Sequence, residues 1–339
     1  MGLEDLVAAA ADRLQRRRWT SAATVGAFVG SSVVMASSGM ARPLAAADGR
    51  SVFEIGSLTK LFTGLILADM VVNSELEIDS PVNSILGDTD LLPTHGGSQI
   101  TLGHLATHAS GLPGSPLSKF AYLRPDAFSR IDDQQVLAAA ARARLSRPPG
   151  TGSPSYSNLG FAVLGIALVR AAGAASYSDL VARRVCEPLG LSDTVTVPDV
   201  EQVHRVAQGF SWGNRPNPPW HLTGLVAAGG LLSTVTDVLS FLREQARPVS
   251  SLGPAIVKMR ELRIGTVDDG IGIAWMLRRS NQTVEMYHSG GTGGFRSWVG
   301  VNPERNAGVV VMAAHADLGR VDHVGEALLA AILAPADQG

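Results

Sequence analysis

Apolar residues recur at two different spacings along the first 70 residues. Repeats of three and four residues are typical of an amphipathic helix, whereas short apolar runs bounded by Gly or Ser are typical of strands. Gly30 separates two such runs and makes them a β-hairpin. The patterns predict a helix at 3–18, strands at 22–29, 32–36 and 51–55, and a long apolar helix from Ser57 to Val71.

The middle and the end of the chain differ in pattern. Between the first long helix and residue 250, helical segments alternate with loops rich in Pro and Gly, and apolar runs separated by turns return after residue 270. The expected elements are helices at 161–172, 177–185 and 235–243, strands at 271–277, 284–288, 295–301 and 307–313, and a last helix at 320–333. Strands near both ends that enclose a helical middle predict one sheet split by a helical insertion.

Composition is that of a globular protein with balanced charge. Hydrophobic residues make up 45% of the 339 residues, which allows a sizeable core and excludes wholesale disorder. Charged residues make up 17% and the net charge is −2, which argues against a basic nucleic-acid-binding surface. The single cysteine, Cys186, excludes an intrachain disulfide and a cysteine-based metal cluster, and we interpret it as a buried inert thiol.

The N-terminal residues contain no recognisable targeting segment. Glu4 and Asp5 are acidic where a signal peptide needs positive charge, and Leu6 breaks the N-myristoylation pattern. Residues 24–41 are uncharged, but Gly and Ser interrupt them, which favours strands over a membrane span. We therefore expect a cytoplasmic protein without a membrane partner.

Three short motifs suggest chemistry that their context does not favour. Gly209–Gly213 (GFSWG) matches a serine nucleophile elbow, but that motif needs a helix after it, and a proline-rich segment follows instead. His104 and His108 are four residues apart, yet no glutamate lies between them and no third ligand follows, so packed histidines are a better interpretation than a metal site. Gly290–Gly294 lacks the spacing of a phosphate-binding loop.

Ser57 and Lys60 form a more specific pattern, S-x-x-K, at the start of the long apolar helix. Residues three apart share one face of a helix, so Lys60 should lie beside Ser57. A serine hydroxyl is a poor nucleophile unless a base lies next to it, and a lysine in apolar surroundings can lose its proton. The alternative, a capping serine with a solvated lysine, predicts a polar surface helix, whereas this helix is apolar on most sides.

A second motif, Tyr156-Ser157-Asn158, follows about a hundred residues later and precedes an expected helix. Tyr156 could act as a proton shuttle if neighbouring cations lower its pKa. Asn158 could orient Lys60 and hydrogen-bond a polar group of a substrate. The alternative is a loop with a helix cap.

A third motif, His288-Ser289-Gly290-Gly291, closes the expected strand at 284–288. Its glycines allow a substrate to approach the backbone closely. An exposed N–H at this place can pair with the N–H of Ser57 as an oxyanion hole, and His288 adds a polar or cationic group to the pocket wall. The alternative is an ordinary turn.

These three motifs, in this order and at these spacings, resemble those of the serine β-lactamase and penicillin-binding-protein superfamily. The resemblance is strongest to the branch of class C β-lactamases, DD-peptidases and family VIII carboxylesterases, which are bacterial enzymes, and it covers nearly the whole chain. Three further stretches match, at 100–113 (ITLGHLATHASGLP), 187–191 (EPLGL) and 228–234 (AGGLLST).

The resemblance implies a role for each motif residue. Ser57 would be the nucleophile that forms an acyl-enzyme, and Lys60 and Tyr156 would share the proton transfers, with either of them as the base in acylation. The substrate would be bound by Asn158, His288 and Gly290, and the oxyanion hole would be formed by the backbone N–H groups of Ser57 and Gly291. No metal or organic cofactor is implied.

One motif departs from the pattern of the class C β-lactamases. His288-Ser289-Gly290 stands where those enzymes usually carry Lys-Thr-Gly. Histidine or tryptophan at this place is commoner among the DD-peptidases and family VIII esterases. A histidine titrates near pH ~6.5, so it does not supply a permanent positive charge for the carboxylate of a β-lactam.

The resemblance implies an α/β (α+β) fold of the β-lactamase/transpeptidase type. We expect residues 1–70 and 255–339 to form an α/β domain with an antiparallel sheet flanked by helices, residues 71–254 to form a mainly helical domain, and the active site to lie at their interface. The candidate rim loops are 112–120 and 212–221, and the candidate apolar walls are Trp220, Phe295 and Trp298, although such aromatics are more often core.

The expected function is hydrolysis of a small ester or amide through a Ser57 acyl-enzyme, with β-lactams among the candidate substrates. Three alternatives stay open: a true class C β-lactamase, an acyl or amide transferase of secondary metabolism, and a non-catalytic ligand-binding protein on this fold. The complete set of Ser57, Lys60, Tyr156 and Asn158 argues against the last, because a protein that has lost its chemistry would usually lack one of them. The sequence predicts no oligomeric state.

Overall fold

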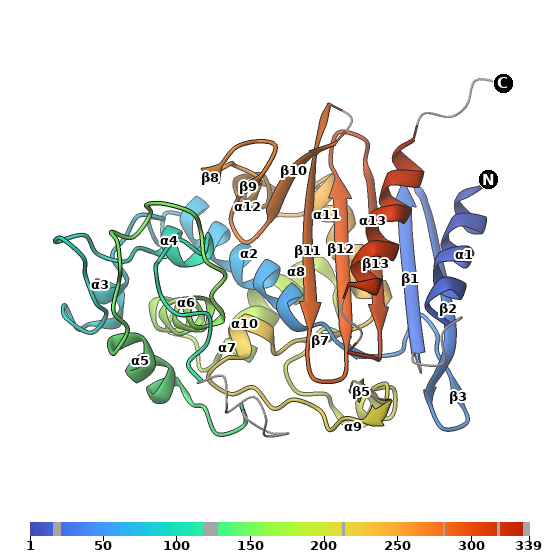
Figure 1. Cartoon of the computed structure of the whole chain (residues 1–339), viewed down its shortest axis with the longest axis horizontal. Coiled ribbons are helices and arrows are strands. Elements are labelled where there is room, and N and C mark those ends of the chain that lie inside the picture. The colour runs from blue at the N-terminus through green and yellow to red at the C-terminus, as the bar shows by residue number, and fades with distance from the viewer. Residues whose placement is uncertain (16–21, 118–127, 212–213, 281, 317–318, 335–339) are drawn as a thin grey trace.

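A nine-stranded antiparallel sheet forms the centre of the molecule (Figure 1). The computed structural model describes residues 1–15, 22–117, 128–211, 214–280, 282–316 and 319–334. The strands, in their order across the sheet, are β3 (Ala45–Ala46), β2 (Ser32–Arg42), β1 (Ala22–Val29), β13 (Ala307–Ala313), β12 (Arg296–Asn302), β11 (Thr283–Gly291), β10 (Met276–Ser280), β9 (Gly270–Ile271) and β8 (Ile264–Gly265). The two ends of the chain therefore meet where β1 pairs with β13.

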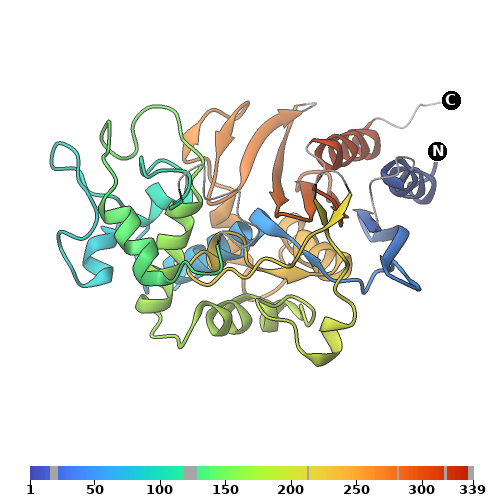
Figure 2. The ribbon, with the colours of Figure 1, turned by 60° about the horizontal axis from the view of Figure 1, so that its bottom comes forward.

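Helices cover both faces of the sheet. Because side chains alternate between faces along a strand, Val25 and Val311 point to one face, towards helices α1 (Leu3–Gln15) and α13 (Arg320–Leu333). Figure 2 shows these two helices side by side beyond the sheet. Phe28 and Met312 point to the other face and join the larger core.

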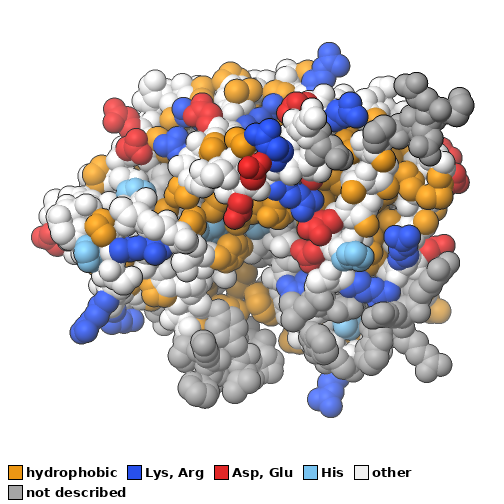
Figure 3. All heavy atoms as spheres, turned by 45° about the horizontal axis from the view of Figure 1, so that its top comes forward, with side chains coloured by type: hydrophobic (Ala, Val, Ile, Leu, Met, Phe, Trp, Pro, Cys, Tyr) orange, Lys and Arg blue, Asp and Glu red, His pale blue; other side chains and the backbone are white. Residues whose placement is uncertain are grey.

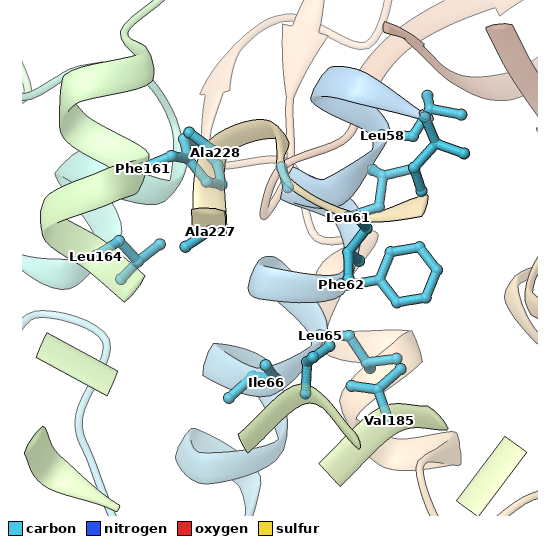
Figure 4. Packing of buried hydrophobic residues seen from close by; sticks show 14 of the residues in the cluster. Leu58, Leu61, Phe62, Leu65, Ile66, Phe161, Leu164, Val185, Ala227 and Ala228 are labelled. Atoms are coloured by element: carbon cyan, nitrogen blue, oxygen red, sulfur yellow. The ribbon is translucent and has the colours of Figure 1, made fainter. Parts of the chain in front are cut away.

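The larger core continues into the helical part of the molecule. Its central helices are α2 (Thr59–Val72) and α6 (Asn158–Ala171), whose apolar side chains meet those of the short helix α10 (Val226–Gly229) (Figure 4). The other helices are α3 (Val82–Leu86), α4 (Leu102–Ala106), α5 (Asp133–Ala141), α7 (Tyr177–Val181), α8 (Glu187–Leu189), α9 (Val200–Val203), α11 (Val235–Ala246) and α12 (Gly253–Met259). Two small ribbons join β4 (Phe53–Glu54) to β7 (Leu232–Ser233) and β5 (Phe210–Ser211) to β6 (Arg215–Pro216).

The domain boundary expected at residue 254 does not follow the packing of helix α11. This helix lies on the sheet, where Gly26 of β1 leaves room for the side chain of Leu239. It therefore belongs with the sheet, although the sequence places it among the helical residues 71–254. One buried hydrophobic cluster also runs through the sheet and the helical part, so the two parts share a core.

Three expected elements differ from the structure. The run at 271–277 is two strands, β9 and β10, with a turn between them in which Ala274 has a φ of +64°. Ala274 N donates to the carbonyl of Ala106 in helix α4, so these buried residues leave the sheet to fill the core. The strand at 51–55 is reduced to β4, outside the main sheet, and the helix at 177–185 changes to a π-helix at 182–186. Residues 16–18 of the first helix lie outside the described residues.

Candidate active site

Ser57 lies in a 3₁₀ turn, Gly56–Leu58, that joins β4 to helix α2. Lys60 follows one turn later and is completely buried. Its Nζ lies 2.9 Å from Ser57 Oγ, 2.8 Å from Asn158 Oδ1 and 2.5 Å from the carbonyl oxygen of Ala228. Burial lowers the pKa of Lys60 well below its ordinary value. The structure therefore joins the first and second sequence motifs through the lysine amine.

Tyr156 lies on the other side of this pair. The Lys60 Nζ is 4.9 Å from the centre of the Tyr156 ring, and the ring of His108 lies 4.4 Å from it, centre to centre. Although Tyr156 is 41% exposed as a whole, burial around its hydroxyl raises the pKa of the phenol, and the hydrogen bond with Ser57 opposes that rise only in part. The lowered pKa that would make this phenol a ready proton acceptor is therefore not found, and Tyr156 is protonated at neutral pH.

The end of strand β11 passes directly over the Ser57 turn. A Cβ atom on Gly56 would lie 2.5 Å from the backbone nitrogen of Gly291, and one on Gly290 would lie 2.2 Å from the carbonyl oxygen of Ile55. Ser297 Oγ of the neighbouring strand also donates to the Ile55 carbonyl, at 2.8 Å. The first N–H groups of a helix have no partner within it, so the helix does not engage the N–H of Ser57, which lies beside the Gly291 backbone where the oxyanion hole is expected.

His288 is buried within the same site, and its ring centre lies 6.3 Å from that of Tyr156. Its Nδ1 lies 2.7 Å from the carbonyl oxygen of Ser289, so Nδ1 carries the proton and donates it. Burial, together with the charge of Lys60, lowers the pKa of His288 to about 3. The imidazole is thus neutral near pH 6.5, whereas the sequence alone was compatible with either a neutral or a cationic His288.

A small pocket of about 50 Å³ opens beside Ser57. Its polar lining comes from Ser57, Asn158 and Gly291, and the rest is mostly apolar, from Phe128, Trp220, Leu222, Leu225, Ala228 and Gly229. The space-filling view shows a hollow between the helical part and the sheet, with hydrophobic side chains along its walls (Figure 3).

The family of the protein follows from comparison with known proteins. A family model described as Beta-lactamase matches residues 7–334. The chain belongs to the beta-lactamase family. This membership identifies the protein as an enzyme of the serine hydrolase type, within the superfamily of β-lactamases and DD-carboxypeptidases.

Three relatives of this beta-lactamase family member, each with a different name, are similar to it in sequence over most of its length. The D-alanyl-D-alanine-carboxypeptidase/endopeptidase AmpH of Escherichia coli K12 is 26% identical over 294 residues, 82% of this chain and 74% of the relative. Penicillin-binding protein 4 of Amycolatopsis lactamdurans is 28% identical over 281 residues, 77% and 71% of the two chains. A beta-lactamase of E. coli K12 is 25% identical over 303 residues, 78% and 75%.

Solved structures confirm the expected fold of the beta-lactamase family. A class C beta lactamase from Rhodobacter sphaeroides superposes with a TM-score of 0.83 at 22% identity, covering 97% of this chain and 100% of the other. An octameric penicillin-binding protein homologue from Pyrococcus abyssi gives 0.84 at 23% identity, covering 98% and 78%. The α/β fold with an antiparallel sheet and flanking helices is therefore shown.

The candidate pocket walls of this beta-lactamase family member divide into two groups. Trp220 lines the pocket, whereas Trp298 packs beneath helix α13 and Phe295 stands edge-on to Phe53 in the core. Of the two rim loops, 118–120 and 212–213 lie outside the described residues. Sequence reasoning missed Phe128, because a single aromatic residue far from any motif carries no signal of its own.

Two of the three unfavoured motifs, the GFSWG motif and the histidine pair, take structural positions. Ser211 of the GFSWG motif lies in the β5–β6 ribbon and donates to the carbonyl of Arg215. His104 Nδ1 accepts from Thr101 N, and His108 Nδ1 accepts from Ser157 N at 3.1 Å, so both histidines are hydrogen-bonded within the fold. Over the described ranges, no group of three His, Cys, Asp or Glu side chains could hold a metal ion. No helix in those ranges is long and apolar enough to span a membrane.

Proposed function

We propose that this protein is a serine acyl hydrolase that acts on a small ester or amide through an acyl-enzyme on Ser57. The observation that carries the proposal is the contact of Ser57 Oγ with the buried amine of Lys60, beside the Gly291 backbone. A hydroxyl, an adjacent base and two convergent N–H groups are the parts that acyl transfer needs.

Lys60 is the base in acylation. Asn158 Oδ1 and the Ala228 carbonyl can only accept hydrogen bonds, so they engage two N–H bonds of the amine. The third position of Nζ faces Ser57 Oγ, and in the neutral amine that position holds the lone pair. The lowered pKa of Lys60 makes this form accessible, while the raised pKa of Tyr156 keeps the phenol protonated.

The steps then follow from these protonation states. Ser57 Oγ attacks the acyl carbon as Lys60 takes its proton, and the carbonyl oxygen gains negative charge between the N–H groups of Ser57 and Gly291. Tyr156 donates its proton to the departing alcohol or amine and regains one from Lys60. Water attacks the acyl-enzyme by the reverse route, which releases the acid and Ser57.

His288 and the pocket favour an ester or amide without a carboxylate as substrate. His288 is neutral, so it supplies no fixed positive charge beside the pocket. The pocket of about 50 Å³ suits a small acyl group. The second candidate is a true β-lactamase, which the relative named beta-lactamase favours.

Hydrolysis of short p-nitrophenyl esters and of a chromogenic cephalosporin tests both candidates. We expect ester turnover that Ser57→Ala abolishes and that Ser211→Ala, the control serine of the GFSWG motif, leaves unchanged. Fast cephalosporin turnover would establish the second candidate instead. An acyl adduct on Ser57 that water does not release would indicate a transferase, and no turnover with no adduct by mass spectrometry would contradict the proposal.

A further inference from the structure

Glu54 is a buried carboxyl group three residues before Ser57. It lies in β4 opposite Leu232 and is 5% exposed. Burial raises the pKa of Glu54, and the neighbouring Thr292 hydroxyl, the Trp220 N–H and the charge of His221 oppose that rise only in part. Burial of a carboxyl group is costly unless its oxygens are paired, so such a group calls for a reason in function or specificity.

The carboxyl group connects the nucleophile segment to one wall of the pocket. Glu54 Oε1 accepts a hydrogen bond from the backbone nitrogen of Trp220 at 2.8 Å. Trp220 lines the pocket beside Ser57, and its ring lies 4.9 Å from that of Phe128, another lining residue. The position of this wall relative to Ser57 therefore depends on Glu54.

The other side of the carboxyl group faces the end of strand β11. Thr292, the residue after Gly291, interacts with Glu54 closely enough to lower the pKa of the carboxyl. Glu54 Oε2 and Thr292 Oγ1 are both buried, and neither makes a hydrogen bond in ordinary geometry, with each other or with another group. The Thr292 hydroxyl is therefore a neighbour of the carboxyl group whose distance or angle is looser than that of an ordinary hydrogen bond.

The wall and the strand end also touch directly. A Cβ atom on Gly293 would lie 2.6 Å from Trp220 Nε1, so the indole rests on the backbone beside Thr292. Glu54, Trp220 and the Thr292–Gly293 segment thus contact one another beside the pocket. A shift of Glu54, Trp220 or Thr292 would therefore change the volume of the pocket beside Ser57.

We propose that Glu54 is a positioning residue that sets the size of the acyl group this enzyme accepts, by holding the Trp220 wall against the Thr292 end of strand β11. The inference rests on the proposed acyl hydrolase function. Loss of the carboxyl group lets the wall move, which weakens contact with a short acyl chain and admits a longer one. Glutamine keeps the acceptor for Trp220 N and preserves the wall.

The test is the ratio of kcat/KM for p-nitrophenyl acetate to kcat/KM for p-nitrophenyl octanoate. We expect Glu54→Ala to lower this ratio at least 10-fold and Thr292→Val to lower it in the same direction. Glu54→Gln should keep the ratio within about 3-fold of wild type, which corresponds to about 0.65 kcal/mol. Asp237→Ala is the matched control, because Asp237 is a buried carboxyl in helix α11 whose pKa burial also raises. Its loss should lower stability and leave the ratio unchanged.

An unchanged ratio in folded Glu54→Ala and Thr292→Val would overturn the inference, as would an equal change in Asp237→Ala. If Glu54→Ala does not fold, Thr292→Val alone decides. Tryptophan fluorescence, compared with Trp220→Phe, separates the two proposals. If the wild-type protein shows no turnover, the hydrolase function is refuted. A changed Trp220 fluorescence in Glu54→Ala or Thr292→Val would in that case still support the positioning role of Glu54. An unchanged Trp220 fluorescence would refute the positioning role as well.

Discussion

Replacement of Gly56 by alanine tests the alignment of the oxyanion donors. Gly56 has a φ of +52°, a conformation that L side chains rarely adopt. An added Cβ atom would lie 2.5 Å from the nitrogen of Gly291 and 2.9 Å from its carbonyl carbon and oxygen. All three are backbone atoms, so no side chain can rotate away, and strand β11 itself must move.

The geometry allows the size of the effect to be worked out. The left-handed conformation costs an alanine about 1–2 kcal/mol of stability. To restore ordinary contact near 3.4 Å, Gly291 must retreat by roughly 0.9 Å, and a displacement of about 1 Å at a reacting centre costs on the order of 10²-fold in rate. We therefore expect Gly56→Ala to lower kcat/KM on a short ester about 10²-fold, mainly through kcat.

Gly30→Ala is the matched control. Gly30 has a φ of +59° in the β1–β2 turn, and an added Cβ atom would meet nothing within 4 Å. It should lose about 1–2 kcal/mol in denaturant unfolding and keep full ester turnover. If Gly56→Ala keeps kcat/KM within about 3-fold of wild type, the Gly291 donor is not held by the Ser57 turn, and the reasoning is refuted.

Two further predictions follow from the pKa shifts. Because only the neutral amine accepts a proton, wild-type kcat/KM should rise with pH through the lowered pKa of Lys60 and then level off. Lys60→Met should remove this rise with pH and lower kcat about 10²–10⁴-fold. A pH–rate profile of the variant that matches that of wild type would contradict the role of Lys60 as the base. Burial raises the pKa of Cys186 to about 12, so a thiol reagent at pH 8 should label it only after unfolding; rapid labelling of the native protein would disprove its burial.

The sequence alone determined the order of the main elements and the three motifs of the candidate site. Helix and strand periodicities are local, so β1, β13, α2 and α13 could be predicted within a few residues of their observed bounds. The S-x-x-K pair was equally local, since three residues of helix bring Lys60 to Ser57. The two later motifs and the family could be inferred from order and spacing, because their chemistry needs particular residue types.

Only the tertiary structure decided the electrostatics and the shape of the site. The run at 271–277 forms two strands because the backbone between them is hydrogen-bonded to distant segments of the chain. Trp298, which the sequence offered as a candidate pocket wall, packs under helix α13 instead. The shifted pKa of Lys60, the neutral His288 and the role of Glu54 all depend on burial by residues far away in the chain. Periodicity reports which side of an element is apolar, whereas desolvation depends on what the rest of the chain brings against it.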